Sequence, residues 1–318
     1  MNLSDFKLES QRTYWAKALV ELGKERQDIV VVSADLSTSV KTSLFAEEFP
    51  ERHFNVGIAE QNMMSISAGL AACGKTVFAS TFAAFGTGRV YDQIRQSIAY
   101  PKLPVNIIAT HAGITVGGDG ATHQIVEDMA LMRALPNMTV IVPADAPETY
   151  RAIKAVADYD GPAYVRMGRA NVPTITSDKG KFKIGKATVL RDGEDVSLIG
   201  TGIMVSRCLL AASILEKHKI SARVIDLSTI KPLDHKTVIK AARETGGVVT
   251  AEEHSVVVGM GSEVALCLTE TAHVPMKRVG IPDVFGQSGD SDELMEEYGL
   301  TPENIVEAAH DVIARKGR

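Results

Sequence analysis

Short apolar runs alternate with helical patterns along the first half of the chain. Runs rich in β-branched residues predict strands, and the segments between them carry apolar residues at helical spacing. The predicted strands are Ile29–Ser33, Thr76–Ser80, Pro104–Thr110, Met138–Pro143 and Ala163–Met167, and the predicted helices lie near Ser10–Leu22, Glu60–Ala72, Gly88–Ser97, Gln124–Arg133 and Ala146–Ala157. Strands that are apolar on both faces are typical of a parallel sheet covered by helices on both sides. The sequence therefore predicts an α/β fold.

Ligands of such sheets bind at the carboxyl ends of the strands. The side chains predicted to lie there are Asp35, Thr81, His111 and Asp145. The functional site is therefore expected at this edge of the first sheet.

The segment Gly168–Gly185 loses the periodic pattern and gains proline, glycine, threonine and lysine, as linkers do. A second alternation follows, with a helix near Val205–Lys217 and a helical tail from Thr301. At 318 residues the chain is long enough for two cores. We expect domains at residues 1–172 and 186–318, joined by a linker at 173–185, each with a mostly parallel sheet flanked by helices.

The composition excludes several classes of protein. A net charge of −5 without a long basic run argues against a nucleic-acid partner. No apolar stretch reaches the ~18 residues of a membrane-spanning helix, and the opening residues are too polar for a signal peptide. The cysteines Cys73, Cys208 and Cys267 are scattered without metal-ligand spacing and are expected to be free thiols of a reducing compartment. We expect a cytoplasmic protein.

Glu60 stands where a predicted strand gives way to a helix, in the run Phe54–Gly74. An acid in the first turn of a helix usually does no more than compensate the helix dipole. A second run, Ala109–Glu127, brings two histidines and an aspartate around a glycine-rich turn. A third stretch, "GMGSEV" at Gly259–Val264, lacks the last glycine of a dinucleotide fingerprint and is weak evidence for one.

Taken together, these runs resemble the middle and C-terminal domains of transketolase. The resemblance rests on five motifs in the family's order, "SADLSTS" (33–39), "VGIAEQNM" (56–63), "TFAAF" (81–85), "ATHAGITVGGDGATHQ" (109–124) and "VFGQSGDSDELMEEYGLTPENIV" (284–306). It extends over nearly the whole chain. It implies a thiamine diphosphate pyrimidine-binding domain followed by a transketolase C-terminal domain.

The same resemblance implies a missing partner. In this family the cofactor lies between two domains, and this chain resembles only one of them. The "GDG" at Gly118–Gly120 resembles a magnesium motif, but Asn137 follows too soon and Asn171 too late for the paired ligand. We therefore expect no metal ligand in this chain, Asp119 included. The resemblance implies a split transketolase, in which an N-terminal subunit holds the diphosphate and Mg²⁺ (or Ca²⁺), assembled as an α2β2 heterotetramer through self-association of this chain.

The resemblance assigns the roles of the family's residues to the matching positions of this chain. Glu60 is expected to hydrogen-bond the aminopyrimidine ring of thiamine diphosphate and so activate it, and Phe82, Phe85 and Asp35 are expected to contact the cofactor. Two aromatic residues three apart are, on their own, more often core residues of a helix. The family often carries a third aromatic residue where this chain has Gly88, which leaves Tyr91 as a substitute.

The resemblance also assigns substrate contacts. His111 and His123 are expected to face the donor and acceptor sugars, with imidazoles that exchange protons near neutral pH. Asp119 is expected to contact the hydroxyl next to the carbonyl. Gly118 replaces a second acid that is frequent in the family.

Arg12, Ser39 and Arg166 match phosphate-binding positions of the family, with Arg169 as a neighbour that can take the place of Arg166. Surface salt bridging is the ordinary alternative for such arginines. The second domain carries Lys231, Glu253 and His254 in motif-like stretches, but we assign them no catalytic role, because that domain chiefly supports dimer packing in this family.

The leading functional hypothesis is transfer of a two-carbon ketol unit from a ketose phosphate to an aldose phosphate, as in the pentose phosphate pathway. Three alternatives stay open. The β subunit of a 2-oxo-acid dehydrogenase shares the pyrimidine domain, but the histidine-rich run with Arg12 and Arg166 suits sugar phosphates better than a lipoyl partner. A split ketol-transferase acting on a sulfonated or branched sugar also fits. A non-catalytic subunit would not need an intact Glu60.

Overall fold

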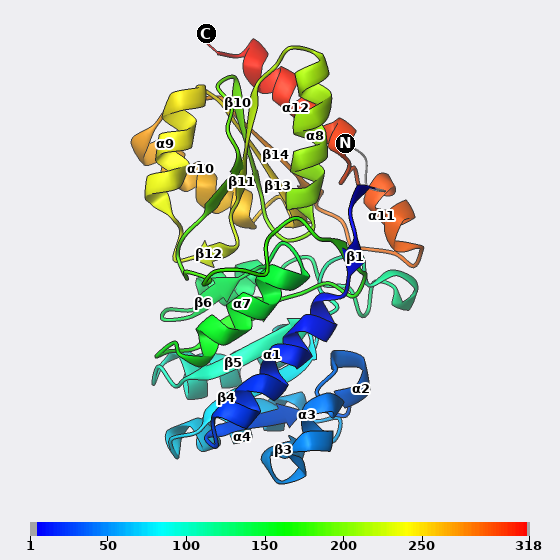
Figure 1. Cartoon of the computed structure of the whole chain (residues 1–318), viewed down its shortest axis with the longest axis vertical. Helices are drawn as coiled ribbons and strands as arrows, with labels where there is room; N and C mark the ends of the chain where they lie inside the picture. Colours follow the sequence, from blue (N-terminus) through cyan, green and yellow to red (C-terminus); the bar gives the residue numbers. More distant parts are fainter. Residues whose placement is uncertain (1–4, 317–318) are drawn as a thin grey trace.

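Two separate sheets form the framework of the protein, whose computed structural model describes residues 5–316 (Figure 1). The first sheet has seven strands in the order β12-β6-β7-β5-β4-β2-β3, and the second has five in the order β14-β13-β10-β11-β9. All neighbours run parallel except β12 beside β6 and β9 beside β11, which are antiparallel. The predicted α/β class with two mostly parallel sheets is confirmed.

The first sheet is built from β2 (Ile29–Ser33), β3 (His53–Asn55), β4 (Thr76–Phe82), β5 (Val105–Thr110), β6 (Thr139–Ile141), β7 (Ala163–Arg166) and β12 (Thr229–Lys231). Its helices are α1 (Gln11–Glu25), α2 (Ser37–Val40), α3 (Ser43–Glu48), α4 (Glu60–Ala72), α5 (Tyr91–Gln93), α6 (Asp128–Ala134) and α7 (Ala146–Ala157). Short helical turns lie at Pro50–Arg52, Gly88–Val90 and Gly117–Asp119, and a π-helix at Ile94–Ala99. A two-residue strand, β1 (Leu8–Glu9), pairs with β8 (Val172–Pro173).

Successive side chains of β2 point to opposite faces of this sheet, as they do along any strand. Ile29 and Val31 pack with α1 and α7 on one face, whereas Val30 and Val32 pack with α4 on the other. Figure 1 shows α1 and α7 lying side by side across the sheet. Burial on both faces is the reason why the strand is apolar throughout.

The second sheet is built from β9 (Thr188–Arg191), β10 (Val196–Gly200), β11 (Ala222–Asp226), β13 (Val248–Ser255) and β14 (Met276–Ile281). Its helices are α8 (Met204–Lys217), α9 (His235–Thr245), α10 (Met260–Thr271), α11 (Ser291–Glu297) and α12 (Pro302–Ala314). The buried residues of α8 and α12 cover one face of the sheet, and those of α9 and α10 cover the other.

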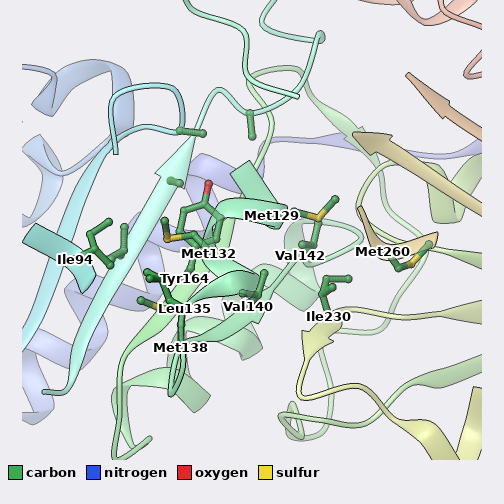
Figure 2. Close-up of a cluster of buried hydrophobic side chains, with 14 of the residues drawn as sticks. Ile94, Met129, Met132, Leu135, Met138, Val140, Val142, Tyr164, Ile230 and Met260 are labelled. Atoms are coloured by element: carbon green, nitrogen blue, oxygen red, sulfur yellow. The ribbon is translucent and has the colours of Figure 1, made fainter. Parts of the chain in front are cut away.

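The two sheets share a hydrophobic core. Strand β12 follows the second domain's β11 in the chain, yet it pairs with β6 at the edge of the first sheet. Figure 2 shows Ile230 of β12 and Met260 of α10 beside Met129, Val140 and Val142 of the first domain. This shared core places the loops of the second domain against the carboxyl edge of the first sheet.

Two predicted helices differ from the observed elements. The segment predicted at Gly88–Ser97 is a chain of short turns that ends in the π-helix. The helix predicted from Gln124 begins only at Asp128, because residues 124–127 form an isolated β-bridge and a bend instead of a helical turn. Gly113 bridges Ile125, and the carbonyl of Val126 accepts a hydrogen bond from the amide of Ser255 at 2.7 Å. Within residues 5–316, no helix is long and apolar enough to cross a membrane.

Candidate active site

Glu60 is the first residue of α4, directly after the turn that follows β3. Its side chain is only 5% exposed. The Asn55 side chain holds this turn, since its Oδ1 accepts hydrogen bonds from the amides of Asp35 and Gly57 at 2.9 and 3.1 Å. One guanidinium reaches the acid, with Nη1 of Arg89 3.2 Å from Glu60 Oε1. Glu60 is therefore a nearly buried carboxylate paired with a guanidinium.

Four rings gather in one cluster near the carboxyl ends of β4 and β5. The rings of Phe82 and Phe85 are stacked with centroids 5.7 Å apart, and Phe82 also stacks on the His111 imidazole at 3.7 Å. The His123 ring meets both phenyl rings edge-on, at 6.4 and 5.3 Å. The structure thus brings together the two expected cofactor aromatics and the two expected substrate histidines.

Arg89 joins the acid to this cluster. Its guanidinium lies 4.3 Å from the centroid of the Phe85 ring while it also bonds to Glu60. Tyr91, the expected substitute for the missing aromatic residue at Gly88, packs against the hydrophobic core instead. Arg89 did not stand out in the sequence; the departure at Gly88, directly before it, is the signal that could have drawn attention to it.

His111 follows β5 with a backbone φ of +58°, in the left-handed region. Its Nδ1 lies 2.8 Å from the hydroxyl oxygen of Thr110. Burial, with the nearby charges of Arg12 and Arg169, lowers the pKa of His111 to about 3. The lowered pKa keeps the imidazole neutral near pH 7.

A cationic pair faces the same loop. Arg12 donates hydrogen bonds to the carbonyl of Ser39 at 2.9 Å and to the carbonyl of Arg169 at 3.1 Å. Arg169 donates to the carbonyl of Val116 at 2.7 Å, and its Nη1 lies 3.6 Å from the carboxylate of Asp119. Burial, followed by the charge of Arg169, lowers the pKa of Arg12. The charges of these two neighbouring arginines favour an anion.

Asp35 lies at the end of β2, which neighbours β4 in the sheet. Its side chain is exposed, its φ is +57°, and its Oδ1 accepts a hydrogen bond from Asn55 at 3.2 Å. It therefore sits on the same sheet edge as Phe82. Asp119 is also exposed, on the turn after Gly117.

Arg166 does not share the position of the other arginines. It is the last residue of β7 and only 4% exposed. Its Nε bonds to the carboxylate of Asp128 at 2.8 Å, and its Nη2 donates to the carbonyl of Glu253 at 2.9 Å. Tyr164 donates to the same carboxylate at 2.7 Å. A guanidinium committed to buried partners does not fit the expected phosphate contact, and we leave it out of the site.

The residues present suit one part of a thiamine diphosphate molecule. A nearly buried carboxylate beside stacked aromatic rings offers a hydrogen-bond partner and an apolar surface for an aminopyrimidine ring. No cluster of three or more His, Cys, Asp or Glu side chains that could hold a metal ion occurs in residues 5–316. The carboxylate and rings thus fit the pyrimidine end of the cofactor.

The sequence matches two domain families in succession. Residues 10–174 match the pyrimidine-binding domain of transketolase, and residues 185–305 match the transketolase C-terminal domain. The pyrimidine-binding domain implies thiamine diphosphate as the cofactor.

Known relatives match along almost their full length. The chain is 48% identical over 301 residues to a transketolase C-terminal section from Methanocaldococcus jannaschii, covering 94% of each chain. It is 42% identical to the 6-deoxy-6-sulfo-D-fructose transketolase subunit SqwH of Clostridium sp. MSTE9, covering 98% of each. A solved split gene transketolase, described as an inactive beta4 tetramer, matches 97% of this chain and 99% of its own, with 51% identity and a TM-score of 0.91. The chain therefore belongs to the transketolase family, as a subunit corresponding to the C-terminal section of a split transketolase.

Proposed function

We propose that this chain, with an N-terminal subunit, transfers a two-carbon ketol unit from a ketose phosphate to an aldose phosphate. The observation that carries the proposal is the gathering of Glu60, the aromatic pair, the two histidines and a cationic pair at one sheet edge. When bound, thiamine diphosphate supplies the nucleophilic carbon that attacks the ketose carbonyl. Proton exchange with the cofactor, packing of its ring and binding of the sugar are tasks of protein side chains.

Glu60 holds the proton that the cofactor's pyrimidine ring needs. A carboxyl group in a nearly buried position can both donate and accept a proton at a ring nitrogen without competition from water. Phe82 and Phe85 are proposed to pack against that ring, and Asp35 to contact the cofactor from the neighbouring strand end. Support comes from the burial of the carboxylate and from its shared neighbour, Arg89, which touches both the acid and Phe85.

His111 and His123 are proposed to hydrogen-bond the sugar oxygens. Because His111 is neutral near pH 7, it can donate one hydrogen bond and accept another, and it places no positive charge beside the reacting carbons. Asp119 is exposed at the mouth of the site, where it is proposed to accept from the hydroxyl next to the carbonyl.

The substrate phosphate is proposed to bind between Arg12 and Arg169, with Ser39 beside them. Support comes from the short chain of contacts Ser39–Arg12–Arg169 and from the buried Nε of Arg12, which lacks a hydrogen-bond partner among residues 5–316. An incoming phosphate would satisfy this cationic pair with charge-assisted hydrogen bonds.

The diphosphate and its Mg²⁺ are proposed to be held by the N-terminal subunit, in an α2β2 heterotetramer that works in the pentose phosphate pathway. Support comes from the relatives that are themselves transketolase subunits or sections. The three cysteines are free thiols, which suits a reducing compartment such as the cytoplasm.

A second candidate substrate class is favoured by one observation. The relative from Clostridium that is 42% identical is named for a sulfonated ketose. A sulfonate is also an anion with three oxygens, so the pair Arg12 and Arg169 suits either group. Because the chain belongs to the transketolase family, we do not retain the dehydrogenase hypothesis.

The test is reconstitution. The chain is mixed with its N-terminal subunit, thiamine diphosphate and Mg²⁺, and is given ribose 5-phosphate as acceptor with either xylulose 5-phosphate or 6-deoxy-6-sulfofructose as donor. Formation of sedoheptulose 7-phosphate from the phosphorylated donor supports the proposal, and formation from the sulfonated donor alone assigns the second class. Absence of transfer from both donors overturns ketol transfer between these sugars, and activity of this chain alone overturns the need for a partner.

A further inference from the structure

The loop at residues 111–124, which carries His111, Asp119 and His123, is held by the second domain. Three side chains or carbonyls of that domain bond to it. Glu253 Oε1 accepts a hydrogen bond from the amide of Thr115 at 2.8 Å, and the hydroxyl of Ser291 donates to the carbonyl of Thr115 at 3.0 Å. The carbonyl of Gln287 accepts from the side chain of Gln124 at 2.9 Å.

Glu253 makes the most deeply buried of these contacts. It lies in β13 and is 5% exposed, and Thr115 is 3% exposed. The carboxylate also presses against the backbone of Gly113, where a Cβ atom would lie 2.2 Å from Glu253 Oε1. Gly113 has a φ of +77°, so both its conformation and this close approach call for glycine. The loop backbone therefore packs directly against the carboxylate of Glu253, which leaves no room for a side chain at Gly113.

The backbone of Glu253 is itself held by Arg166. Its carbonyl accepts a hydrogen bond from Arg166, whose guanidinium is fixed by the carboxylate of Asp128. Burial raises the pKa of Glu253, while the charge of Arg166 and the amide of Thr115 act in the opposite direction. A continuous chain of contacts thus runs from α6 through β7 and β13 to the loop.

We propose that Glu253 is a positioning residue of the ketol-transfer site, which fixes the loop bearing His111 and Asp119 through the amide of Thr115. This inference rests on the proposed function. It gives the second domain a part in substrate positioning, where the sequence assigned that domain and Glu253 no catalytic role. Only three residues lie between His111 and Thr115. A displaced amide therefore shifts the imidazole, and misplacement of about 1 Å can cost about 100-fold in rate.

The test uses three variants of the full chain. Glu253→Ala removes the acceptor, Glu253→Gln keeps an oxygen for the Thr115 amide, and Ser291→Ala removes the milder contact from α11. Glu252→Ala is the matched control, because this neighbouring buried carboxylate accepts from the amides of Met260 and Gly261 and so caps α10.

Hydrogen exchange of the loop amides, measured in the isolated chain, does not depend on activity. We expect Glu253→Ala to speed exchange across residues 112–124 by about tenfold or more, with a smaller increase for Ser291→Ala and little change for Glu253→Gln. In the reconstituted enzyme we expect a loss of about 10- to 100-fold in kcat for Glu253→Ala, an unchanged Kd for thiamine diphosphate, and rescue by Glu253→Gln.

The outcomes separate the two proposals. Faster exchange without any ketol transfer by the wild-type enzyme refutes the proposed function and leaves the contact between Glu253 and the loop standing. Loop exchange at the wild-type rate in both Glu253→Ala and Ser291→Ala overturns the positioning role. The same loop pattern in Glu252→Ala also overturns it, since that result would reflect general loosening of the second domain. If Glu253→Ala does not fold, the loop exchange rates of Ser291→Ala and Glu253→Gln decide whether the positioning role stands.

Discussion

The guanidinium of Arg89 lies 3.2 Å from the carboxylate of Glu60 and 4.3 Å from the centroid of the Phe85 ring. These are two of the groups proposed to hold the pyrimidine ring of the cofactor. The side chain of Gln61 donates to the carbonyl of Arg89 at 2.9 Å, which keeps the arginine close to the start of α4. Arg89 therefore contacts both the acid and the aromatic pair, and we expect cofactor binding to displace it.

Arg89→Ala is expected to tighten binding of thiamine diphosphate by the reconstituted enzyme. The half-exposed ion pair and the cation–π contact together stabilise the present arrangement by about 1 kcal/mol, which corresponds to about fivefold in Kd. Calorimetric titration of the cofactor measures this change. Arg95→Ala is the control, since Arg95 is an exposed arginine of the same segment. Weaker binding by Arg89→Ala would mean that the arginine is part of the cofactor pocket.

Glu60→Gln is expected to slow ketol transfer severely while the fold persists. The amide retains the size of the side chain but cannot hold and release a proton at the pyrimidine ring, which costs about 10²- to 10⁴-fold in kcat. Steady-state rates of the reconstituted variant measure the loss, and circular dichroism of the isolated chain checks the fold. Turnover near that of the wild type would remove Glu60 from its proposed role.

Arg169→Gln is expected to raise the KM for phosphorylated sugars. Loss of one charge-assisted hydrogen bond of about 1.5–3 kcal/mol corresponds to about 10- to 100-fold. The KM for an unphosphorylated ketol donor, such as hydroxypyruvate, should stay unchanged, because that donor carries its carboxylate beside the reacting carbonyl and has no distal phosphate for the arginine to bind. Arg315→Gln, at the end of α12, is the control on a distant surface. An equal rise for both donors would argue against phosphate binding.

Local patterns in the sequence were enough to predict the bounds of those helices and strands that local contacts determine. The bounds of β2, α4 and α7 agree with the prediction because each has a full apolar face and, in α7, an Asp145 cap that accepts from the amide of Glu148. The prediction of a helix from Gln124 was wrong because distant contacts, not local ones, determine this segment. Among its first four residues, Gln124 bonds to the carbonyl of the distant Gln287 and Val126 to the amide of the distant Ser255, which no local pattern reveals.

The two arginines at 166 and 169 show the same limit within the site. Both follow the same apolar run, and only the end of β7 decides which one is buried. Arg166 is the last residue of the strand and bonds to Asp128, 38 positions away, whereas Arg169 lies beyond the strand and reaches Val116. The prediction of α/β architecture needed only the pattern of apolar residues; the pairing of charges needed the packed structure.

Arg166→Gln is expected to reduce stability and to have no selective effect on phosphorylated substrates. It leaves the buried carboxylate of Asp128 without its charged partner, and breaking a buried pair in this way costs about 3–5 kcal/mol. Urea unfolding of the isolated chain measures the change, with Arg169→Gln as the comparison, which should unfold within about 0.5 kcal/mol of the wild type. A stable Arg166→Gln variant with a KM raised only for sugar phosphates would restore Arg166 to the site.

The neutral state of His111 predicts a dependence of stability on pH. Burial and the charges of Arg12 and Arg169 lower its folded-state pKa to about 3, below the ordinary value of 6.5. Between these two values the unfolded chain binds a proton that the folded chain does not, so the free energy of unfolding falls as the pH is lowered from about 6.5 toward about 3. One such group contributes a slope of up to about 1.4 kcal/mol per pH unit.

Other buried groups also titrate in this range, so the comparison has to be between variants. Burial lowers the pKa of His254 to about 4, which acts in the same direction, and raises the pKa of Glu252 to about 7, which acts in the opposite one. His111→Asn removes only the imidazole, and asparagine tolerates the left-handed backbone at this position. Urea unfolding at several pH values from 7 to 5 should give a shallower loss of stability for His111→Asn than for the wild type. Parallel curves would show that His111 titrates as it does in the unfolded chain.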